Sequence, residues 1–328
     1  MNAILTEFTG DAPAIAIIGM CKNAGKTTVL NRFINEYHWL GRRIAATSVG
    51  RDGERVDLVT GTEKPSIYLH EGMLAATASG LLPFSDVSRE ILDVTDHMTP
   101  LGRVVIFKAR SSGFVQLAGP SSVNDMALLC KQLYAHGAET VLIDGALDRR
   151  SPAASALDGS CVLSTGASLG KDMDAVVDAT AFICRLMTLP VHDHEITSAG
   201  RFTAFGNGGI IAADTVEDLC AALRNMAAVG VVVSGAFTDT MAHFIWQSNV
   251  ELDGMRLIVE DSSRILFEQG TYGRLLARGA NFLVKHETRL VAVAINPVSS
   301  GGWRFDADLF LEKMRHATAL PVVDVERQ

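Results

Sequence analysis

Apolar residues recur along this chain either in short continuous runs or at helical spacing. Residues 14 to 18, Ala-Ile-Ala-Ile-Ile, form a continuous run that is typical of a buried strand and stops at Gly19. Residues 27 to 37 have the spacing of an amphipathic helix. Its apolar positions are Val29, Leu30, Phe33, Ile34 and Tyr37. The start of the chain therefore predicts a strand, a glycine-containing loop and a helix in succession.

The same two patterns continue along the rest of the chain. Further strands are expected within residues 42–50, 103–109, 140–143, 230–236, 256–261, 289–297 and 320–325. Helices are expected at 123–136, 216–226, 240–247 and 307–316, and an alanine-rich helical stretch is expected before residue 82. Repeated strand-helix-strand order favours an α/β fold, with a mostly parallel sheet and helices on both of its faces.

Polar and turn-forming residues around Pro190, in the stretch "TLPVHDHEITSAGRF", indicate a boundary. The sequence thus predicts a first region at 1–190 and a second α/β region at 191–328. The second region is either a separate lobe or an extension of the first sheet.

Composition excludes several classes of function. The formal net charge of the 328 residues is -8, so nucleic acid is not the expected main partner. No apolar segment has the length of a membrane span, and the N-terminal stretch "MNAILTEFTGDAP" lacks the features of a signal peptide. The five cysteines are scattered, which predicts neither a disulfide framework nor a thiolate metal site. We expect a cytoplasmic protein, for which a homo-oligomer remains open.

The stretch "GMCKNAGKTT" occupies the predicted junction between strand and helix. Free backbone N–H groups and the helix dipole bind anions at such a junction. Lys26 is expected to reach the terminal phosphates of a nucleotide, and the Thr27 hydroxyl to ligate Mg²⁺. Five residues rather than the usual four separate Gly19 from Gly25, and the alternative is a glycine turn with one exposed lysine. The predicted nucleotide-binding residues are Gly19, Lys22, Asn23, Ala24, Gly25, Lys26, Thr27 and Thr28.

Phosphoryl transfer also needs carboxylates that hold Mg²⁺ and position the attacking group. In "TVLIDGALDR" an apolar strand ends at Asp144, which is expected beside the loop with its carboxylate near the metal. In "TSVGRDGERVD" Asp52 is the second candidate and Glu54 the reserve. We therefore assign Lys26, Asp52 and Asp144 to catalysis, while a turn remains the alternative for both aspartates.

Other polar residues are weaker candidates. Ser121 in "LAGPSS" and Thr165 in "LSTGASLG" can touch phosphate or substrate, although helix capping is the simpler interpretation. Asn296 can read an adenine edge or start a turn. His192 and His194 in "VHDHE" lack the further ligands of a metal site, which leaves a solvated loop as the alternative. ATP is favoured over GTP because the chain has no Asn-Lys-x-Asp segment.

The loop resembles those of P-loop NTPases, in particular dethiobiotin synthetase, which has the same glycine spacing. It is also similar to the GTP-binding protein of molybdenum-cofactor biosynthesis, whose core looks like residues 22–28. One branch of this class uses a second lysine across a dimer. Lys22 stands one residue closer to Gly25 than that pattern requires, so we interpret it as a phosphate contact only.

The runs "GMCKNAGKTTVLN", "TSVGRDGE", "GLLPFSD", "LIDGALDR" and "INPVSSGGWRFDADLF" resemble a bacterial family of reactivating-factor subunits for the cobalamin-dependent lysine 5,6-aminomutase. The resemblance implies an Mg²⁺-dependent ATPase that releases damaged cofactor from a stalled aminomutase. It also implies that loops near Arg51 or Gly119 relay the state of the γ-phosphate. Two alternatives remain. One is a dethiobiotin synthetase-like ligase or kinase acting on a small carboxylate, and the other is a nucleotide-binding regulatory module without turnover.

Overall fold

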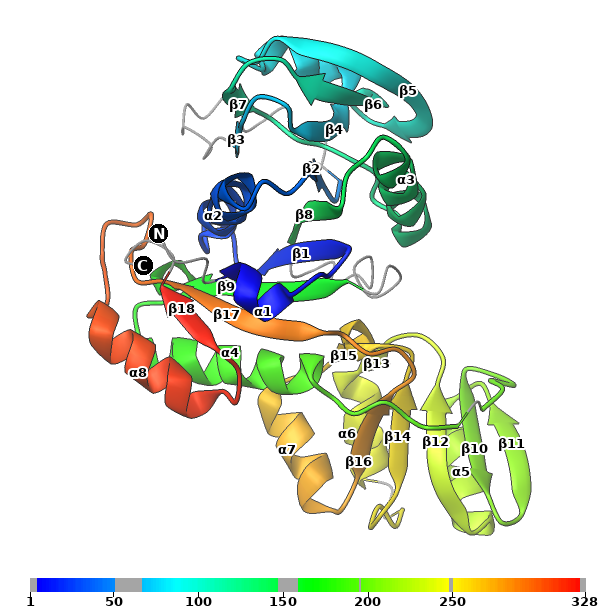
Figure 1. Ribbon diagram of the computed structural model, residues 1–328. Coiled ribbons are helices and arrows are strands. Elements are labelled where there is room, and N and C mark those ends of the chain that lie inside the picture. Colours follow the sequence, from blue (N-terminus) through cyan, green and yellow to red (C-terminus); the bar gives the residue numbers. More distant parts are fainter. Residues whose placement is uncertain (1–4, 51–66, 147–158, 195, 248–249, 325–328) are drawn as a thin grey trace. The chain divides into compact units, whose positions relative to one another are not determined.

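The computed structural model describes residues 5–50, 67–146, 159–194, 196–247 and 250–324. The expected positions Asp52 and Glu54, and also Arg51, lie outside these residues. The chain forms two compact units, one of residues 1–181 with 289–328 and one of residues 182–288 (Figure 1). This division differs from the predicted boundary at residue 190, because the last forty residues return to the first unit and add strands to its sheet.

A nine-stranded sheet forms the centre of the first unit, in the order β18-β17-β9-β1-β8-β2-β4-β6-β5. Neighbouring strands are parallel from β18 to β4, and β6 is antiparallel to both β4 and β5. The strands are β1 (Ala14–Gly19), β2 (Ile44–Ser48), β4 (Leu74–Ala78), β5 (Arg89–Thr99), β6 (Gly102–Ala109), β8 (Thr140–Ala146), β9 (Ser160–Gly166), β17 (Leu290–Asn296) and β18 (Val322–Asp324). A separate antiparallel pair joins β3 (Ile67–Leu69) to β7 (Gly113–Val115). The fold is therefore α/β with a large, mostly parallel sheet.

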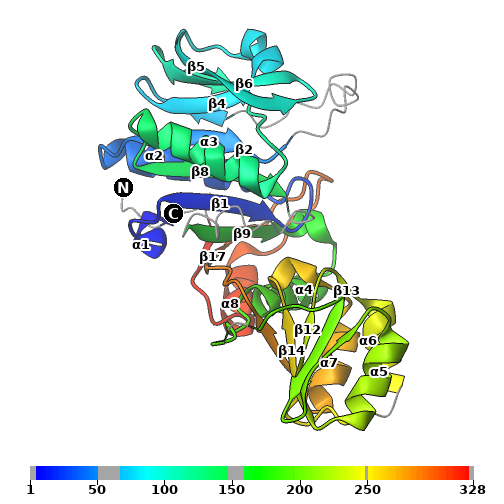
Figure 2. The same cartoon turned by 90° about the vertical axis from the view of Figure 1, so that its right-hand side faces the viewer.

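Helices lie on both faces of this sheet. Ile15 and Ile17 of β1 share one core with α1 (Leu5–Thr9) and α2 (Lys26–Trp39). Val141 and Ile143 of β8 share the other core with α3 (Val123–Ala135), on the opposite face (Figure 2). Alternate residues of a strand point to opposite faces, and both faces are apolar, so these strands read as continuous hydrophobic runs. The remaining helices of this part of the chain are α4 (Met173–Met187) and α8 (Ala307–Ala317).

The alanine-rich stretch before residue 82 is a correction to the sequence prediction. Residues Leu74–Ala78 form β4, in which all five residues are buried, and a 3₁₀ helix follows at Ser79–Phe84. Small side chains let β2 and β6 pack on either side of this strand, and burial on both faces removes the period-two pattern. Alanine's helix propensity is a weak preference that such packing overrides.

The second unit contains a five-stranded sheet in the order β11-β10-β12-β14-β16. Its parallel strands are β12 (Ala228–Val233), β14 (Arg256–Val259) and β16 (Asn281–Val284), and its antiparallel hairpin is β10 (Phe202–Gly206) with β11 (Gly209–Ala213). Its helices are α5 (Val216–Asn225), α6 (Asp239–Gln247) and α7 (Gln269–Ala277), and a two-residue pair joins β13 (Phe237–Thr238) to β15 (Ile265–Leu266). Aromatic rings pack together in its core, and the rings of Tyr272 and Phe282 are tilted with their centroids 4.7 Å apart.

No helix among the described residues is both long enough and apolar enough to cross a membrane.

A buried glutamate joins α2 to the start of the described chain. The Glu36 side chain is 3% exposed, and its Oε2 accepts hydrogen bonds from the backbone N–H groups of Leu5 (3.1 Å) and Thr6 (3.0 Å). Its Oε1 accepts from Nε of Arg32 at 2.7 Å. These N–H groups belong to the first turn of α1, where no intrahelical acceptor exists. Glu36 therefore caps α1 from a neighbouring helix.

Replacing Glu36 by alanine should lower the free energy of unfolding by about 2–3 kcal/mol, because hydrogen bonds to a charged group contribute roughly that much. Urea denaturation followed by circular dichroism measures the change. Glu7→Ala is the matched control, since Glu7 is exposed on α1. Equal stability of the two variants would contradict the capping role of Glu36.

Candidate functional site

The parallel strands bring several polar segments to one edge of the sheet. β8 lies between β1 and β2, so that Asp144 is paired with Ile17 on one side and Ser48 on the other. β9 follows β1 on its other side, and β17 follows β9. Ligands bind beyond the carboxyl ends of strands in open parallel sheets. The predicted phosphate loop after β1 and Asp144 at the end of β8 therefore meet at the edge where a ligand is expected.

The loop after β1 has the geometry of an anion cradle. Asn23 has φ 62° and Gly25 has φ 95°, both in the left-handed region. Gly25 is the N-cap of α2 and supplies no side chain to the first N–H groups of the helix. Left-handed residues in a loop turn successive N–H groups to one side, and the helix dipole adds positive potential there. The loop can therefore bind an anion with its backbone.

Lys26 folds back across this loop. A Cβ built on Gly19 would lie 2.8 Å from Cγ and Cδ of Lys26 and 2.9 Å from its Nζ. Glycine at position 19 is thus what lets the lysine chain lie against the end of β1. The Lys26 ammonium therefore lies beside the loop, where it can bind a phosphate.

Two neighbouring strands support the loop from one side. The Ser164 hydroxyl donates to the carbonyl of Ala24 at 2.6 Å, and the N–H of Met20 donates to the Ser164 carbonyl at 2.9 Å. A Cβ on Gly25 would lie 3.2 Å from Cβ and Nδ2 of Asn296. Ala24 is fully buried by these contacts. The shape of the loop is therefore fixed by the ends of β9 and β17.

Asp144 has one carboxylate oxygen, the buried Oδ1, without a hydrogen-bond partner among the described residues at this edge. Burial raises the pKa of Asp144 to about 6, and the positive charge of Lys26 opposes that rise. A buried carboxylate oxygen without a hydrogen-bond donor raises the free energy of the folded state, and a bound cation would lower it.

Other predicted candidates have different roles. Thr165 is fully buried, and its hydroxyl is 2.9 Å from that of Thr180, so it faces α4. Ser121 is exposed, and its neighbour Ser122 caps α3 by accepting from the N–H of Asp125 at 3.1 Å. The Oδ1 of Asn296 accepts a hydrogen bond from the N–H of Val298 at 2.9 Å. Asn296 therefore starts a turn, which is one of the two interpretations that the sequence allowed. The exposed Lys22 and the partly buried Thr27 and Thr28 all lie on or next to the loop.

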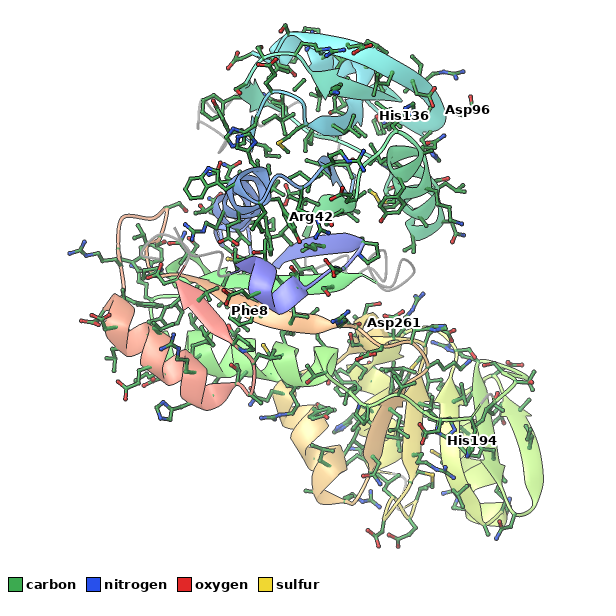
Figure 3. The ribbon with its side chains drawn as sticks, viewed as in Figure 1. Phe8, Arg42, Asp96, His136, His194 and Asp261 are labelled. Atoms are coloured by element: carbon green, nitrogen blue, oxygen red, sulfur yellow. The ribbon has the colours of Figure 1, made fainter. Side chains whose placement is uncertain are left out.

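The two histidines of the "VHDHE" stretch belong to the second unit, where Figure 3 labels His194. The ring centroids of His192 and His194 are 5.9 Å apart and nearly perpendicular. Burial lowers the pKa of His192, and the nearby charge of Arg256 lowers it further. No group of three or more His, Cys, Asp or Glu side chains capable of holding a metal occurs in the described part of the chain.

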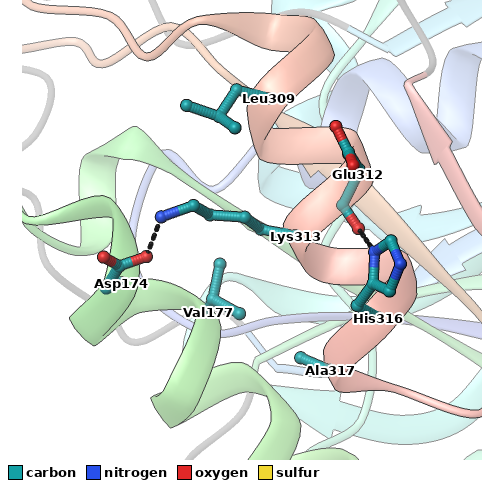
Figure 4. Close-up of a pocket in the computed structure, with 7 residues that line it drawn as sticks. All are labelled: Asp174, Val177, Leu309, Glu312, Lys313, His316 and Ala317. Carbon is teal, nitrogen blue, oxygen red and sulfur yellow. Dashed lines mark hydrogen bonds and ion pairs between the residues drawn. The ribbon is translucent and has the colours of Figure 1, made fainter.

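A hollow of about 460 Å³ lies between α4 and α8, away from the residues that form the loop. Val177, Leu309 and Ala317 give it an apolar floor, and Lys313 makes an ion pair with Asp174 at its rim (Figure 4). The imidazole Nδ1 of His316 lies 2.8 Å from the carbonyl of Glu312 on the same helix. None of these side chains contributes to the site at the carboxyl edge of the sheet.

Comparison with known proteins identifies no relative: no family model, curated protein or solved structure gives a match to this chain.

The support of the loop by Ser164 and Ser300 was absent from the sequence prediction. Ser300 accepts a hydrogen bond from Nδ2 of Asn23 at 3.1 Å across 277 residues of chain. For Ser300 the sequence signal is its position just after the strand predicted at 289–297, and no strand is predicted from the sequence around Ser164. Local sequence patterns do not determine the order of strands in the sheet, and that order decides whether the ends of two strands lie side by side.

Replacing Asp144 by asparagine should stabilise the metal-free protein at about pH 8. In the unfolded chain the carboxyl titrates near its ordinary value of 3.8, whereas in the folded protein it titrates near 6. The folded state thus holds the proton longer, and wild-type stability falls as the pH rises from about 4 to about 6. Above that interval the variant should gain on the order of 3 kcal/mol in the free energy of unfolding.

Urea denaturation in the presence of a chelator measures this difference at about pH 4 and about pH 8. Asp178→Asn is the control, because Asp178 is exposed on α4. The expectation fails if Asp144→Asn is no more stable than wild type at the higher pH.

Proposed function

We propose that this protein binds ATP with Mg²⁺ at the Gly19–Thr28 loop and hydrolyses it, as a P-loop NTPase. The observation that carries the proposal is the buried Oδ1 of Asp144, which has no partner among the described residues and lies at the same sheet edge as Lys26. A left-handed loop that opens a fourteen-residue helix supports it independently. Together they supply donors for phosphate and a carboxylate for a cation.

The donor set fits Mg²⁺, which prefers oxygen ligands and shares them with substrate phosphates. The Thr27 hydroxyl and the Asp144 carboxylate would hold the ion. Mg²⁺ bound there would neutralise charge on the phosphate oxygens during transfer. Lys26 would bind the terminal phosphates, and the backbone N–H groups of the loop would orient them. Asp52, proposed to position the attacking water, belongs to the segment outside the described residues.

We propose further that turnover is coupled to a protein partner, the role implied by the resemblance to aminomutase reactivating factors. Release of a tightly bound, damaged cobalamin requires a conformational change that nucleotide binding or hydrolysis can drive. A ligase or kinase of the dethiobiotin synthetase type is the alternative, and it predicts acceleration by a small carboxylate instead. A regulatory module would bind ATP without cleaving it.

Lys26→Ala should weaken ATP binding by about 10- to 100-fold, because a charge-assisted hydrogen bond contributes roughly 1.5–3 kcal/mol. Gly19→Ala should act in the same direction, since the added Cβ displaces the Lys26 side chain while leaving the backbone in place. Isothermal titration calorimetry with ATP and with GTP, each with Mg²⁺, measures both effects.

The control for the glycine is Gly208→Ala, where an added Cβ meets no atom within 4 Å. Thermal unfolding of each variant checks that the fold is kept. Unchanged ATP affinity in Lys26→Ala would show that the loop is not part of the ATP-binding site.

Asp144→Asn should retain nucleotide binding and lose Mg²⁺-dependent phosphate release. The expected loss is about tenfold or more, since even outer-shell partners of a metal contribute that much. Phosphate release is measured with and without a lysine 5,6-aminomutase, with Asp178→Asn as the control. Stimulation of phosphate release by the aminomutase supports the partner-coupled role. Stimulation by a small carboxylate alone supports the ligase or kinase function instead. Unchanged turnover in Asp144→Asn would show that another carboxylate holds the metal.

A further inference from the structure

The connection between β17 and α8 forms a tight, internally bonded turn. The N–H groups of Ser299 and Phe305 donate to the carbonyls of Trp303 and Pro297, both at 2.9 Å. Within the turn, the N–H of Gly301 donates to Oγ of Ser299 at 3.1 Å. Residues 297–305 are thus held in one shape by their own hydrogen bonds, and we call them the 297–305 turn.

The 297–305 turn is also fastened to the segment that follows β9. The indole Nε1 of Trp303 donates to the carbonyl of Ala167 at 3.0 Å, and the N–H of Ser300 donates to Oγ of Ser168 at 3.4 Å. The ammonium of Lys171 lies 5.1 Å from the centre of the Trp303 ring. Three contacts to one short segment leave the turn little freedom to rotate.

This fixed turn presents one hydroxyl to the phosphate loop. The Nδ2 of Asn23 donates to Oγ of Ser300 at 3.1 Å. Among the described residues, Asn23 is the one non-glycine residue with positive φ. Asparagine tolerates the left-handed conformation better than most residues, but it also populates ordinary turns. A side-chain anchor is therefore what selects the left-handed state at position 23.

We propose that Ser300 is a positioning residue for the phosphate loop, which it holds through Asn23 in the conformation that binds a nucleoside triphosphate. The inference rests on the proposed nucleotide site. Ser300 does not touch the phosphates, and it acts by keeping the N–H groups around Ala24 and Gly25 turned to one side. Its position 277 residues from Asn23 makes the C-terminal segment part of the site.

Ser300→Ala removes the acceptor and should weaken MgATP binding by about three- to tenfold, as expected for one neutral hydrogen bond. Ser300→Thr keeps a hydroxyl and should restore affinity. Asn23→Gly permits the left-handed backbone without the anchor and should lose a similar factor. The double variant with Ser300→Ala should be no weaker than the single ones, because both remove the same interaction.

Val298→Ala is the matched control, since Val298 is exposed in the same turn and its apolar side chain makes no hydrogen bond. An effect of Val298→Ala equal to that of Ser300→Ala would reduce Ser300 to a structural role and overturn the proposal. Equal affinity of Ser300→Ala and wild type would overturn it as well.

A second readout needs no nucleotide. Cys21 lies in the loop and is partly exposed, whereas the other four cysteines are buried. A chromogenic disulfide reagent should therefore react with Cys21 about three- to tenfold faster in Ser300→Ala than in wild type, because the freed loop exposes the thiol more often. Ser300→Thr and Val298→Ala should react at the wild-type rate.

The two readouts separate the two proposals. If wild type binds no ATP but the Cys21 rates change as expected, the positioning of the loop stands and the nucleotide function fails. If wild type binds ATP but neither affinity nor Cys21 reactivity responds to Ser300→Ala, the nucleotide function stands and the positioning role is wrong.

Discussion

The carboxylate of Asp144 lies near the carboxyl end of a strand that is paired on both sides, and one of its oxygens is buried without a donor among the described residues. An ion in that position costs free energy unless a cation or hydrogen-bond donors compensate it. Lys26 supplies a positive charge nearby, but burial still dominates and raises the pKa of Asp144 to about 6. The phosphate loop and Lys26 lie at the same sheet edge as this carboxylate.

Close approach of neighbouring side chains and backbone explains the glycines of this edge. Gly19 leaves space for the Lys26 side chain, and Gly25 both takes a left-handed conformation and lies against Asn296. A Cβ on Gly166 would lie 2.0 Å from the carbonyl oxygen of Asn296. These three glycines let the ends of β1, β9 and β17 approach closely, so that the side chains of Ser164 and Asn296 can contact the loop.

Local sequence patterns predicted the parts of this structure that local chemistry decides. Periodicity and turn residues predicted the strand, loop and helix around Lys26 and the strand that contains Asp144, although that strand continues to Ala146. β4 was misassigned because five small or apolar residues in a row fit a buried strand as well as a helix. The direction of the Thr165 side chain could not be predicted locally, because it depends on which face of its strand the residue occupies, and its hydroxyl lies 2.9 Å from that of Thr180. The support from Ser164 and Ser300 depends on strand order, which periodicity does not encode.

Chain connectivity makes the site a late product of folding. The segment after β9 leads through α4 into the unit of residues 182–288, and the chain returns from that unit at β17. β17 pairs with β9 although more than one hundred residues separate the two strands along the chain, as the register of Leu290 with Cys161 shows. Contacts of such sequence separation form slowly because the chain must first lose the entropy of the enclosed loop. The loop after β1 can form its helix early, but the partners that fix its shape, Ser164, Asn296 and Ser300, come together only when the C-terminal strands have joined the sheet.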